Sequence, residues 1–361
     1  MGFKETGEKI YEDLYDVVRR KSAVKRRINE FTHKSVSGLL TSEQKRAVKK
    51  FYAPYKIPNL VFHNYFTEKT GEFHPEYIPI DLYVGYIDSY FNNIKEAKYL
   101  DNKCYFSSIF YQIPQPVTIA KRVNYIWLDG DNKVINLSEL KEIVESEEGV
   151  FLKEAQTSAG GHGVVFIGKS NSAMEQIQKA VNSVPTDILL QRRIEQHNYM
   201  AAINPSSVNT LRIYSILGRD GSVTNYSSVL RTGVGDTKVD NFSSGGLSVG
   251  ITEDGILRKY GYNKLGNRVA VHPTTGLVFE NYKIPSFMMA VELVRKAHSM
   301  IPHFRSVSWD IAIIKDGSPI LIEANLCRGG IDLLQLSNGP LYGKDTKKIL
   351  DEVFSKYRNK H

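Results

Sequence analysis

The stretch SWDIAIIKDGSPILIEANLCRGG (residues 308–330) has the pattern of a β-hairpin with acidic side chains in an apolar setting. Two apolar segments flank the Asp-Gly dipeptide at residues 316–317, which is typical of a two-residue hairpin turn. If the residues on either side of this dipeptide pair, Asp310 lies directly opposite Glu323. Asn325 then follows on the same face, because successive side chains alternate between the faces of a strand.

Two carboxylates placed opposite each other in a sheet destabilise it unless a positive charge lies between them. Asp310, Glu323 and Asn325 offer hard oxygen donors, which suit Mg²⁺ completed by phosphate oxygens and water. We therefore predict that these three residues bind magnesium. Two alternatives stay open: a register slip by one residue would put the acids on opposite faces, or Arg328 or a lysine neutralises the pair.

A second signal is the glycine-rich segment TSAGGHGVVFI (residues 157–167), which joins two predicted strands. The alternative to a ligand site is an ordinary hairpin turn. Beside a magnesium site, however, bare amides of this kind can lie over the phosphates of a nucleoside triphosphate, where a Cβ would prevent approach. Lys153, on the entering strand, would otherwise be read as a surface lysine. We predict phosphate contacts from Lys153 and from four residues of the loop: Ser158, Gly160, Gly161 and Gly163.

Composition sets wide bounds on the class of protein. The chain has 361 residues, 42% hydrophobic and 24% charged, as in a globular protein. No apolar run approaches the roughly 20 residues of a membrane span, and the charged N-terminus predicts no secretory signal. Cys104 and Cys327 lie far apart without metal-binding spacing, so we expect two free thiols and a cytoplasmic protein.

The net charge of +8 is concentrated near the N-terminus. Residues 1–60 hold fourteen Lys and Arg against seven Asp and Glu, densest in RRKSAVKRR (19–27) and KRAVKK (45–50). Such runs form either a solvated helix face or a surface for a polyanion or an anionic membrane. Because no RNA-binding signature or zinc-finger spacing accompanies them, we expect no nucleic-acid partner; peripheral membrane contact stays open.

The order of patterns along the chain predicts an α+β protein with mostly antiparallel sheets. Residues 1–55 have helical periodicity, with Thr41 and Gln44 in capping-box register. The aromatic stretch at 55–90 suits either a core or stacking on sugar rings, in short strands, helices and loops. Later elements include a strand near 124–128, helices near 137–146, 172–183 and 285–300, and many strands beyond residue 200. We expect three parts: an N-terminal helical or mixed region for substrate recognition (1–112), a part with the glycine-rich loop (113–195), and a part with the metal site (196–361).

These motifs, in this order from about Leu100 to Asn325, resemble the ATP-grasp superfamily. SSVNTLRIYSIL and VDNFSSGG look most like the sugar-transfer-associated ATP-grasp proteins, and are similar also to ribosomal-protein-modifying glutamate ligases. The Asp…Glu-x-Asn ending at residues 310–325 is the most specific part of the match. The resemblance implies an ATP-grasp fold, in which two α+β subdomains enclose ATP, preceded by a helical N-terminal region.

The resemblance also implies the nucleotide contacts. LDNKCYFSSIFYQIPQP is similar to the family's Asp-Lys helix, so Lys103 would be the first phosphate lysine and Lys153 the second. LLQRRI looks like the interdomain hinge, where Gln191 and Ile194 would offer backbone groups to adenine. The acidic residue expected a few positions further, near the ribose, is not clear, because Glu195 comes early.

For the reaction centre, the resemblance points to Arg212 in NTLRI, Arg231 in VLRTG and Asn241 in DNFSSGG, near the transferred phosphate. An internal salt bridge is the alternative role for each arginine. The family's usual reaction uses ATP and one or two Mg²⁺ ions to convert a carboxylate into an acyl phosphate, which an amine then attacks. The chain is thus expected to be a carbon–nitrogen ligase.

The implied partners are a small molecule or glycan that bears a carboxylate and an amine co-substrate. An example would be an acidic sugar or polysaccharide decorated with an amino acid, which would place the enzyme in polysaccharide biosynthesis. Two other functions stay open: a kinase that phosphorylates a sugar or another small molecule, and a non-catalytic adaptor that binds polyanions through the basic N-terminus.

Overall fold

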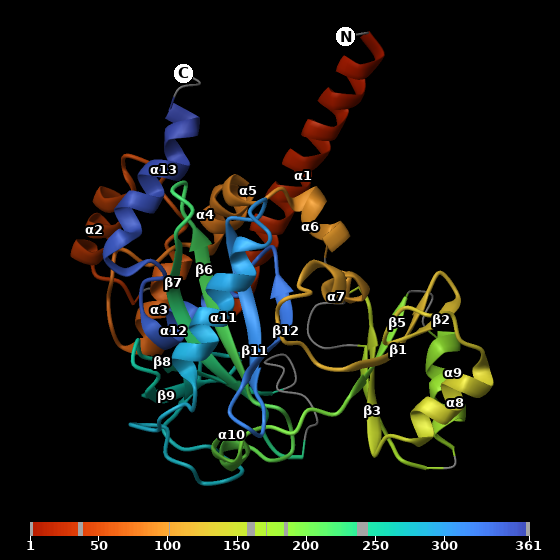
Figure 1. Cartoon of the computed structure of the whole chain (residues 1–361). Coiled ribbons are helices and arrows are strands. Elements are labelled where there is room, and N and C mark those ends of the chain that lie inside the picture. The colour runs from red at the N-terminus through yellow and green to blue at the C-terminus, as the bar shows by residue number, and fades with distance from the viewer. Residues whose placement is uncertain are drawn as a thin grey trace. The chain divides into compact units, whose positions relative to one another are not determined.

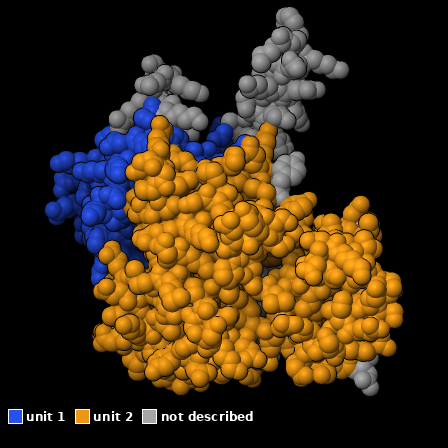
Figure 2. All heavy atoms as spheres, viewed as in Figure 1, with its two compact units in different colours: residues 1–93, 265–267, 330–361 blue, residues 94–264, 268–329 orange. Residues whose placement is uncertain are grey.

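A computed structural model describes residues 3–34, 39–100, 102–156, 163–170, 172–183, 187–236 and 245–358. The chain forms two compact units (Figure 2). Unit 1 consists of Met1–Asn93, Leu265–Asn267 and Gly330–His361, and unit 2 of Ile94–Lys264 and Arg268–Gly329. The last 32 residues therefore belong with the N-terminal region. In the described residues, no helix is both long and apolar enough to cross a membrane.

Unit 1 is helical. Its helices are α1 (Phe3–Lys34), α2 (Ser42–Tyr52), α3 (Val61–Thr70), α4 (Ile80–Leu82), the π-helix η1 (Tyr83–Ile87), α5 (Asp88–Phe91), α12 (Ile331–Asn338), η4 (Gly343–Asp345) and α13 (Thr346–Arg358). The predicted capping box begins α2: Gln44 N donates to Thr41 Oγ1 at 3.2 Å, and Thr41 N donates to Gln44 Oε1 at 2.9 Å. Satisfying these amides fixes the start of the helix.

The aromatic stretch supplies the core of unit 1. Phe31 of α1 packs against Phe62 and Tyr65 of α3, with ring centroids 5.1 and 4.7 Å apart. These rings, with Phe66 and Tyr77, are at most 2% exposed. The core alternative is thus the one observed, and these buried rings are not placed to stack on a sugar.

Polar contacts join the two ends of the chain within unit 1. Arg27 of α1 donates to Asp332 of α12 at 2.9 Å and to Glu30 at 2.6 Å. Gln335, fully buried, accepts from Ile78 N at 2.6 Å and donates to Ile78 O at 2.9 Å. The basic run of α1 is therefore not entirely a solvated face.

Unit 2 begins with α6 (Ile94–Leu100), the 3₁₀-helix η2 (Lys103–Tyr105) and α7 (Phe106–Ile109), and then builds two sheets (Figure 1). The smaller sheet has the order β2-β1-β5-β3-β4. Its strands are β1 (Thr118–Val123), β2 (Ile126–Asp129), β3 (Gly149–Glu154), β4 (Val164–Gly168) and β5 (Ile188–Arg192). All neighbouring strands are antiparallel.

Helices α8 (Leu137–Glu145) and α9 (Ala173–Ser183) cover one face of the smaller sheet (Figure 1). Buried Leu140 and Ile177 of these helices pack in one cluster with Leu152 and Leu190 of the strands. The strand predicted near 124–128 corresponds to β2, which begins two residues later, whereas β1 was not predicted. Residues 124 and 125, both with positive φ, form the turn between β1 and β2, a conformation typical of tight hairpin turns.

The larger sheet has the order β10-β9-β8-β7-β6-β11-β12. Its strands are β6 (Thr210–Leu217), β7 (Val223–Thr232), β8 (Leu247–Ile251), β9 (Leu257–Tyr262), β10 (Arg268–Val269), β11 (Ser306–Ile313) and β12 (Pro319–Asn325), with α10 (Asn198–Ile203) and α11 (Phe287–Ser299). α11 packs on one face, where Ala290 and Val294 meet a buried layer that includes Ile213 and Trp309. The predicted α+β class with antiparallel sheets is confirmed.

Candidate functional site

The β11–β12 hairpin differs from its predicted geometry in two places that compensate each other. Its turn has three residues, not two: Ile314 N donates to Ser318 O at 2.9 Å, and Gly317 has the left-handed φ of +89° that such loops require. Ile311 then pairs with Leu321, whereas Asp310 pairs with Glu323, so Ile322 is an extra residue in β12.

This bulge decides which way Glu323 points. Without it, the three-residue turn would put Glu323 opposite Trp309, on the face that packs against α11. One extra residue turns every following side chain to the other face. Glu323 therefore lies on the face of Asp310, as predicted, but for a different reason.

Three charged residues lie side by side across the larger sheet. Arg212 of β6 pairs with Asp310 of β11, which pairs with Glu323 of β12. We call Arg212, Asp310 and Glu323 the charged row. Ser308 pairs with Asn325 two residues further along the same two strands, so all three predicted metal ligands share one face.

Two arginines bind Asp310. Arg212 donates from Nε to Oδ1 at 2.8 Å and from NH2 to Oδ2 at 2.7 Å, and Arg231 of β7 donates to Oδ2 at 3.0 Å. The side chain of Asp310 is only 5% exposed. Burial alone would raise the pKa of this carboxyl, but the charges of Arg212 and Arg231 lower the pKa to about 2. Asp310 is therefore ionised at neutral pH.

Lys103 neutralises Glu323, the second acid of the pair. Its Nζ lies 3.1 Å from Glu323 Oε1, and both side chains are less than one fifth exposed. The backbone holds Lys103 in place, because Lys103 N donates to Ala155 O at 2.8 Å and Asn102 caps η2 through Cys104 N at 2.9 Å.

Side chains thus neutralise the acidic pair, as one of the two alternatives proposed. They come from Arg212, Arg231 and Lys103, whereas Arg328 is exposed. The acidic pair by itself therefore does not require a metal to be stable. Both arginines also make the internal salt bridges that were the alternative to phosphate contact.

The fit to magnesium rests on the kind and position of the donors. Among the described residues, no group of three His, Cys, Asp or Glu side chains could hold a metal ion. Asp310, Glu323 and Asn325 bring two carboxylates and an amide together, with Asn325 Nδ2 3.5 Å from Asp310 Oδ2. This oxygen-rich set fits Mg²⁺. The three arginine hydrogen bonds use most of the roughly four acceptor positions of Asp310, so Glu323 and Asn325 would supply most of the ligation.

The predicted nucleotide residues of the smaller sheet share its uncovered face. Lys153 of β3 pairs with Leu189 of β5, and Gln191 pairs with Phe151 two residues further on. Leu190, with the opposite orientation, packs under α8 and α9. Lys153 and Gln191 therefore stand on the face that these helices do not cover.

Lys121 of β1 stands on the same face, because it also pairs with Leu189. It was not among the predicted residues. Its signal in the sequence is a lysine inside the strand TIAKRV (residues 118–123).

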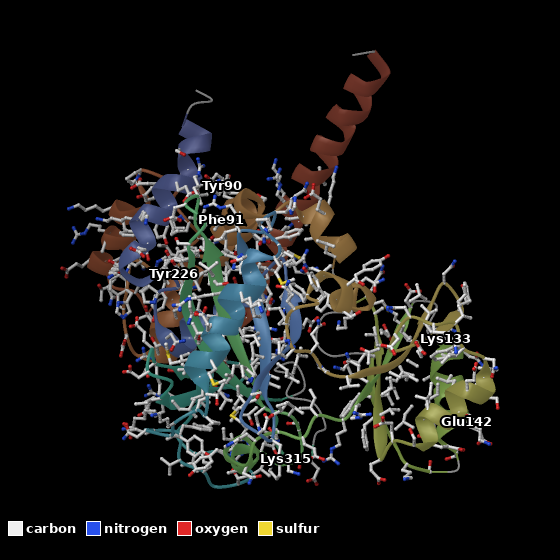
Figure 3. All side chains as sticks on the ribbon, in the orientation of Figure 1. Tyr90, Phe91, Lys133, Glu142, Tyr226 and Lys315 are labelled. Carbon is white, nitrogen blue, oxygen red and sulfur yellow. The ribbon has the colours of Figure 1, made fainter. Side chains whose placement is uncertain are left out.

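The segment after β5 leads to the larger sheet. Glu195 pairs with Lys315, with 2.8 Å between Oε2 and Nζ. Lys315 lies at the tip of the β11–β12 hairpin (Figure 3). Both side chains are more than two thirds exposed. Gln196 instead holds the loop before β6, donating to Ser207 O at 2.8 Å and accepting from Asn209 N at 3.0 Å. Ile194, half-buried, directly precedes Glu195 in the sequence.

Several predicted residues lie outside the described part of the chain: Ser158, Gly160 and Gly161 of the glycine-rich loop, and Asn241. Gly163 is described and has a φ of +89°. A Cβ there would lie 2.5 Å from Glu154 Cδ, and Gly163 O accepts from Glu154 N at 2.9 Å. The turn geometry alone therefore requires glycine at this position.

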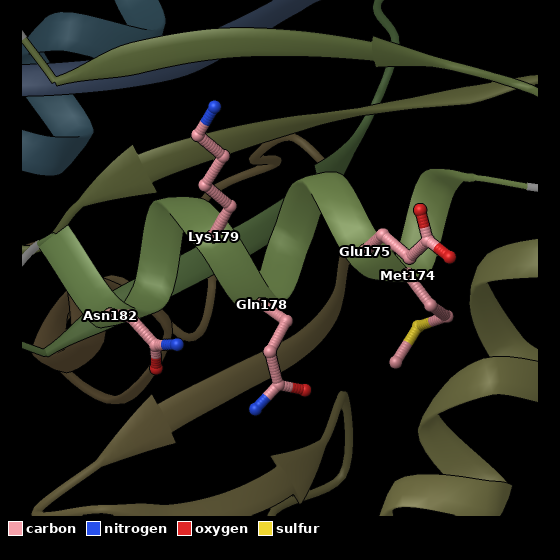
Figure 4. Close-up of a pocket in the computed structure, with 5 residues that line it drawn as sticks. All are labelled: Met174, Glu175, Gln178, Lys179 and Asn182. Carbon is pink, nitrogen blue, oxygen red and sulfur yellow. The ribbon is translucent and has the colours of Figure 1, made fainter.

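A hollow in the described residues lies elsewhere, over α9 (Figure 4). It has a volume of about 500 Å³ and is lined by Met174, Glu175, Gln178, Lys179 and Asn182. A second hollow of about 370 Å³ lies where β3 and β4 meet α8 and α9. None of the predicted site residues lines either hollow.

The model of the family described as sugar-transfer associated ATP-grasp matches residues 84–350. No curated protein matches the sequence.

Similar solved structures include D-cycloserine synthetase, at 10% identity over 74% of this chain and 73% of that one, with a TM-score of 0.44. D-alanine–D-alanine ligase from Bacillus anthracis is 11% identical over 77% of this chain and 71% of that one, with a TM-score of 0.40. An N5-carboxyaminoimidazole ribonucleotide synthetase in complex with ADP is 11% identical over 63% of this chain, at a TM-score of 0.39. The match spans only 45% of that synthetase.

Proposed function

This chain belongs to the sugar-transfer associated ATP-grasp family, and from that premise we propose that it is an ATP- and Mg²⁺-dependent ligase that joins a carboxylate to an amine. The proposed order is transfer of the γ-phosphoryl group to a carboxylate, followed by attack of the amine. The products would be ADP, inorganic phosphate and an amide.

The observation that supports this proposal best is the ion pair between Lys103 and Glu323 at 3.1 Å. It brings the first predicted phosphate lysine, on η2 beside the smaller sheet, to the predicted metal carboxylate on the larger sheet. A triphosphate bound between the two sheets would meet positive charge and metal ligands together. Phosphoryl transfer depends mainly on such positioning and charge neutralisation.

Each charged residue has a proposed task. Lys103 and Lys153 would hold the phosphates, and Glu323 and Asn325, with Asp310, would hold the ion. Bound Mg²⁺ would neutralise charge on the β- and γ-phosphates. Adenine would be contacted by backbone groups of Gln191 and Ile194. The phosphates would be contacted by the glycine-rich loop.

Arg212 and Arg231 are held in place by Asp310 before any ligand binds. Guanidinium groups fixed in this way can stabilise charge that develops on the transferred phosphoryl group without first being reoriented. Asn241 is proposed to act beside them. In this scheme Asp310 serves chiefly to position the two arginines.

The carboxylate oxygen would attack the γ-phosphorus while the bond to the bridging oxygen of ADP breaks. The resulting acyl phosphate would react with an amine at its carbonyl carbon, and phosphate would leave as the amide forms and the amine loses a proton. Exclusion of water protects such an intermediate, a role that we propose for the glycine-rich loop.

The family description supports a sugar-related substrate. We propose an acidic sugar or glycan as the carboxylate and an amino acid as the amine, in a cytoplasmic step of polysaccharide biosynthesis. The buried aromatic rings of unit 1 do not support this choice, so it rests on the family and on carboxylate chemistry.

The test is release of ADP by the purified chain with Mg²⁺ and pooled acidic sugars and amino acids, with Glu323→Ala as the control. Turnover that requires both a carboxylate and an amine, and is lost in the control, supports the ligase. Turnover with an alcohol acceptor and no amine would show a kinase. Binding of polyanions without any nucleotide binding would show an adaptor.

A further inference from the structure

Lys121 is a buried lysine in the middle of β1. It is 7% exposed, and within the described part of the chain its ammonium makes no hydrogen bond or ion pair. The Lys121 Nζ is not among the buried side-chain nitrogen and oxygen atoms that lack a partner in the described residues, so the ammonium reaches solvent while its stem is buried. An ammonium held in this way is available to an anion that comes from solution.

The sheet register gives the direction in which Lys121 stands. Leu189 of β5 pairs with Lys121 on one side and with Lys153 of β3 on the other. Residues directly opposite each other share a face, so the two lysines flank Leu189 on the face that α8 and α9 leave uncovered. Two strand spacings separate their backbones by roughly 10 Å.

Lys121 and Lys103 both act on the thiol of Cys104. Burial raises the pKa of the Cys104 thiol to about 12, and Asp187 adds to the rise, whereas the charges of Lys121 and Lys103 oppose it. Cys104 shares a small buried cluster with Ala155 and Leu189. The charges of Lys103 and Lys121 thus both act on a thiol in the cluster that contains Leu189, the residue between Lys121 and Lys153.

The nearby carboxylate, Asp187, has other partners than Lys121. Asp187 accepts from Asn124 N at 2.9 Å and from Asn102 Nδ2 at 3.4 Å, and no ion pair joins Asp187 to Lys121 among the described residues. Asp187 therefore organises the backbone around η2 and the β1–β2 turn.

We infer that Lys121 is a third cationic contact for the phosphates of the bound nucleotide, beside Lys103 and Lys153. This inference rests on the proposed ATP-dependent function. Three lysines on elements that meet near Leu189 match the high negative charge of a triphosphate. The apolar stem of Lys121 would pack in the sheet while its head meets the anion.

The test compares Lys121→Met, which keeps an apolar stem without the charge, with Lys121→Arg, which keeps the charge. Arg122→Met is the matched control, because Arg122 is the next residue on β1, points to the other face and lies over the Tyr125 ring at 5.5 Å. Dissociation constants for ATP, ADP, AMP and adenosine are measured with Mg²⁺ by calorimetry, with adenosine followed by competition. Thermal unfolding of each variant checks the fold.

Lys121→Met should weaken binding of at least one phosphorylated nucleotide by about 10- to 100-fold, the range of a charge-assisted hydrogen bond, and leave adenosine binding unchanged. Lys121→Arg should restore most of the affinity, and Arg122→Met should match the wild type. The shortest nucleotide affected identifies the phosphate that Lys121 contacts.

Wild-type affinity for all four ligands in Lys121→Met, alongside a loss in Lys153→Met, would overturn this inference and leave the proposed function standing. An equal loss of ATP and adenosine binding would overturn it too, because it would show a structural role. If the wild-type chain binds none of the four, the proposed function fails and this inference with it.

Discussion

Arg212 binds Asp310 through two parallel hydrogen bonds of 2.8 and 2.7 Å, from neighbouring strands of the larger sheet. The pair is almost fully buried, with side-chain exposures of 13% and 5%. A fork of this geometry holds the guanidinium in one orientation. Asp310 thereby fixes Arg212, and with Arg231 it connects three strands.

Removing Asp310 should destabilise unit 2 strongly. Asp310→Ala leaves two guanidiniums buried without their counter-ion, and breaking a buried pair in this way costs about 3 to 5 kcal/mol. Denaturant unfolding followed by tryptophan fluorescence measures the change. Glu292→Ala is the control, since it breaks only an exposed ion pair with Arg295 and should cost less than about 1 kcal/mol. Equal stability of the two variants would contradict this account of Asp310.

Glu195 should not matter for nucleotide binding. Its carboxylate pairs with Lys315 on the surface, so Glu195→Ala should leave the KM for ATP within about twofold, in line with the small energies of exposed ion pairs. Lys103→Met, which removes a buried contact of Glu323, should raise the KM for ATP by about tenfold or more. Steady-state ADP release compares the two. A tenfold rise in Glu195→Ala would instead show that Glu195 reaches the ribose.

The stability of unit 2 should fall as the pH drops from about 6.5 to about 4. His298 is buried between Ser215 Oγ and Phe304 O, both at 2.8 Å. Burial lowers the pKa of His298 to about 4, although the bond to Phe304 O opposes this. Between the two pH values the unfolded chain binds a proton that the folded chain does not, so acid favours unfolding.

The expected loss from His298 is about 3 kcal/mol between pH 7 and pH 4, at about 1.36 kcal/mol per pKa unit. Tryptophan fluorescence reports it, because the rings of His298 and Trp309 lie 5.5 Å apart. His298→Gln should flatten the dependence. Asp310, with its pKa lowered to about 2, adds stability above the usual aspartate pKa that is lost only in stronger acid. An unchanged slope in His298→Gln would show that other groups control the response.

Gln335 should be essential to the stability of unit 1. Its amide satisfies both backbone groups of Ile78, 257 residues away. Gln335→Ala leaves two buried backbone groups without partners, each costing about 1 to 3 kcal/mol. Limited proteolysis of residues 39–93 should therefore speed up, whereas Gln112→Ala, at an exposed position, should cleave at the wild-type rate. Equal rates would show that the contacts of α12 are dispensable.

Local patterns in the sequence were enough to identify most helices, the hairpin at 308–330 and the face that carries Asp310, Glu323 and Asn325. This is possible because side-chain alternation in a strand is set by the backbone of the strand itself. The family could also be identified from the order of short motifs. The roles of the predicted residues, and the four that lie outside the described part, remain predictions.

Tertiary structure decided the partners of these residues. The three-residue turn shifts the pairing of β11 and β12 by one residue, and the extra residue Ile322 shifts it back. The Asp-Gly dipeptide predicts neither the longer turn nor the bulge. The acids are neutralised by residues 79 to 220 positions away in sequence, namely Arg212, Arg231 and Lys103. The C-terminal helices belong to the same unit as the N-terminal region. Pairing between distant segments depends on which surfaces can be buried together, and no local period encodes it.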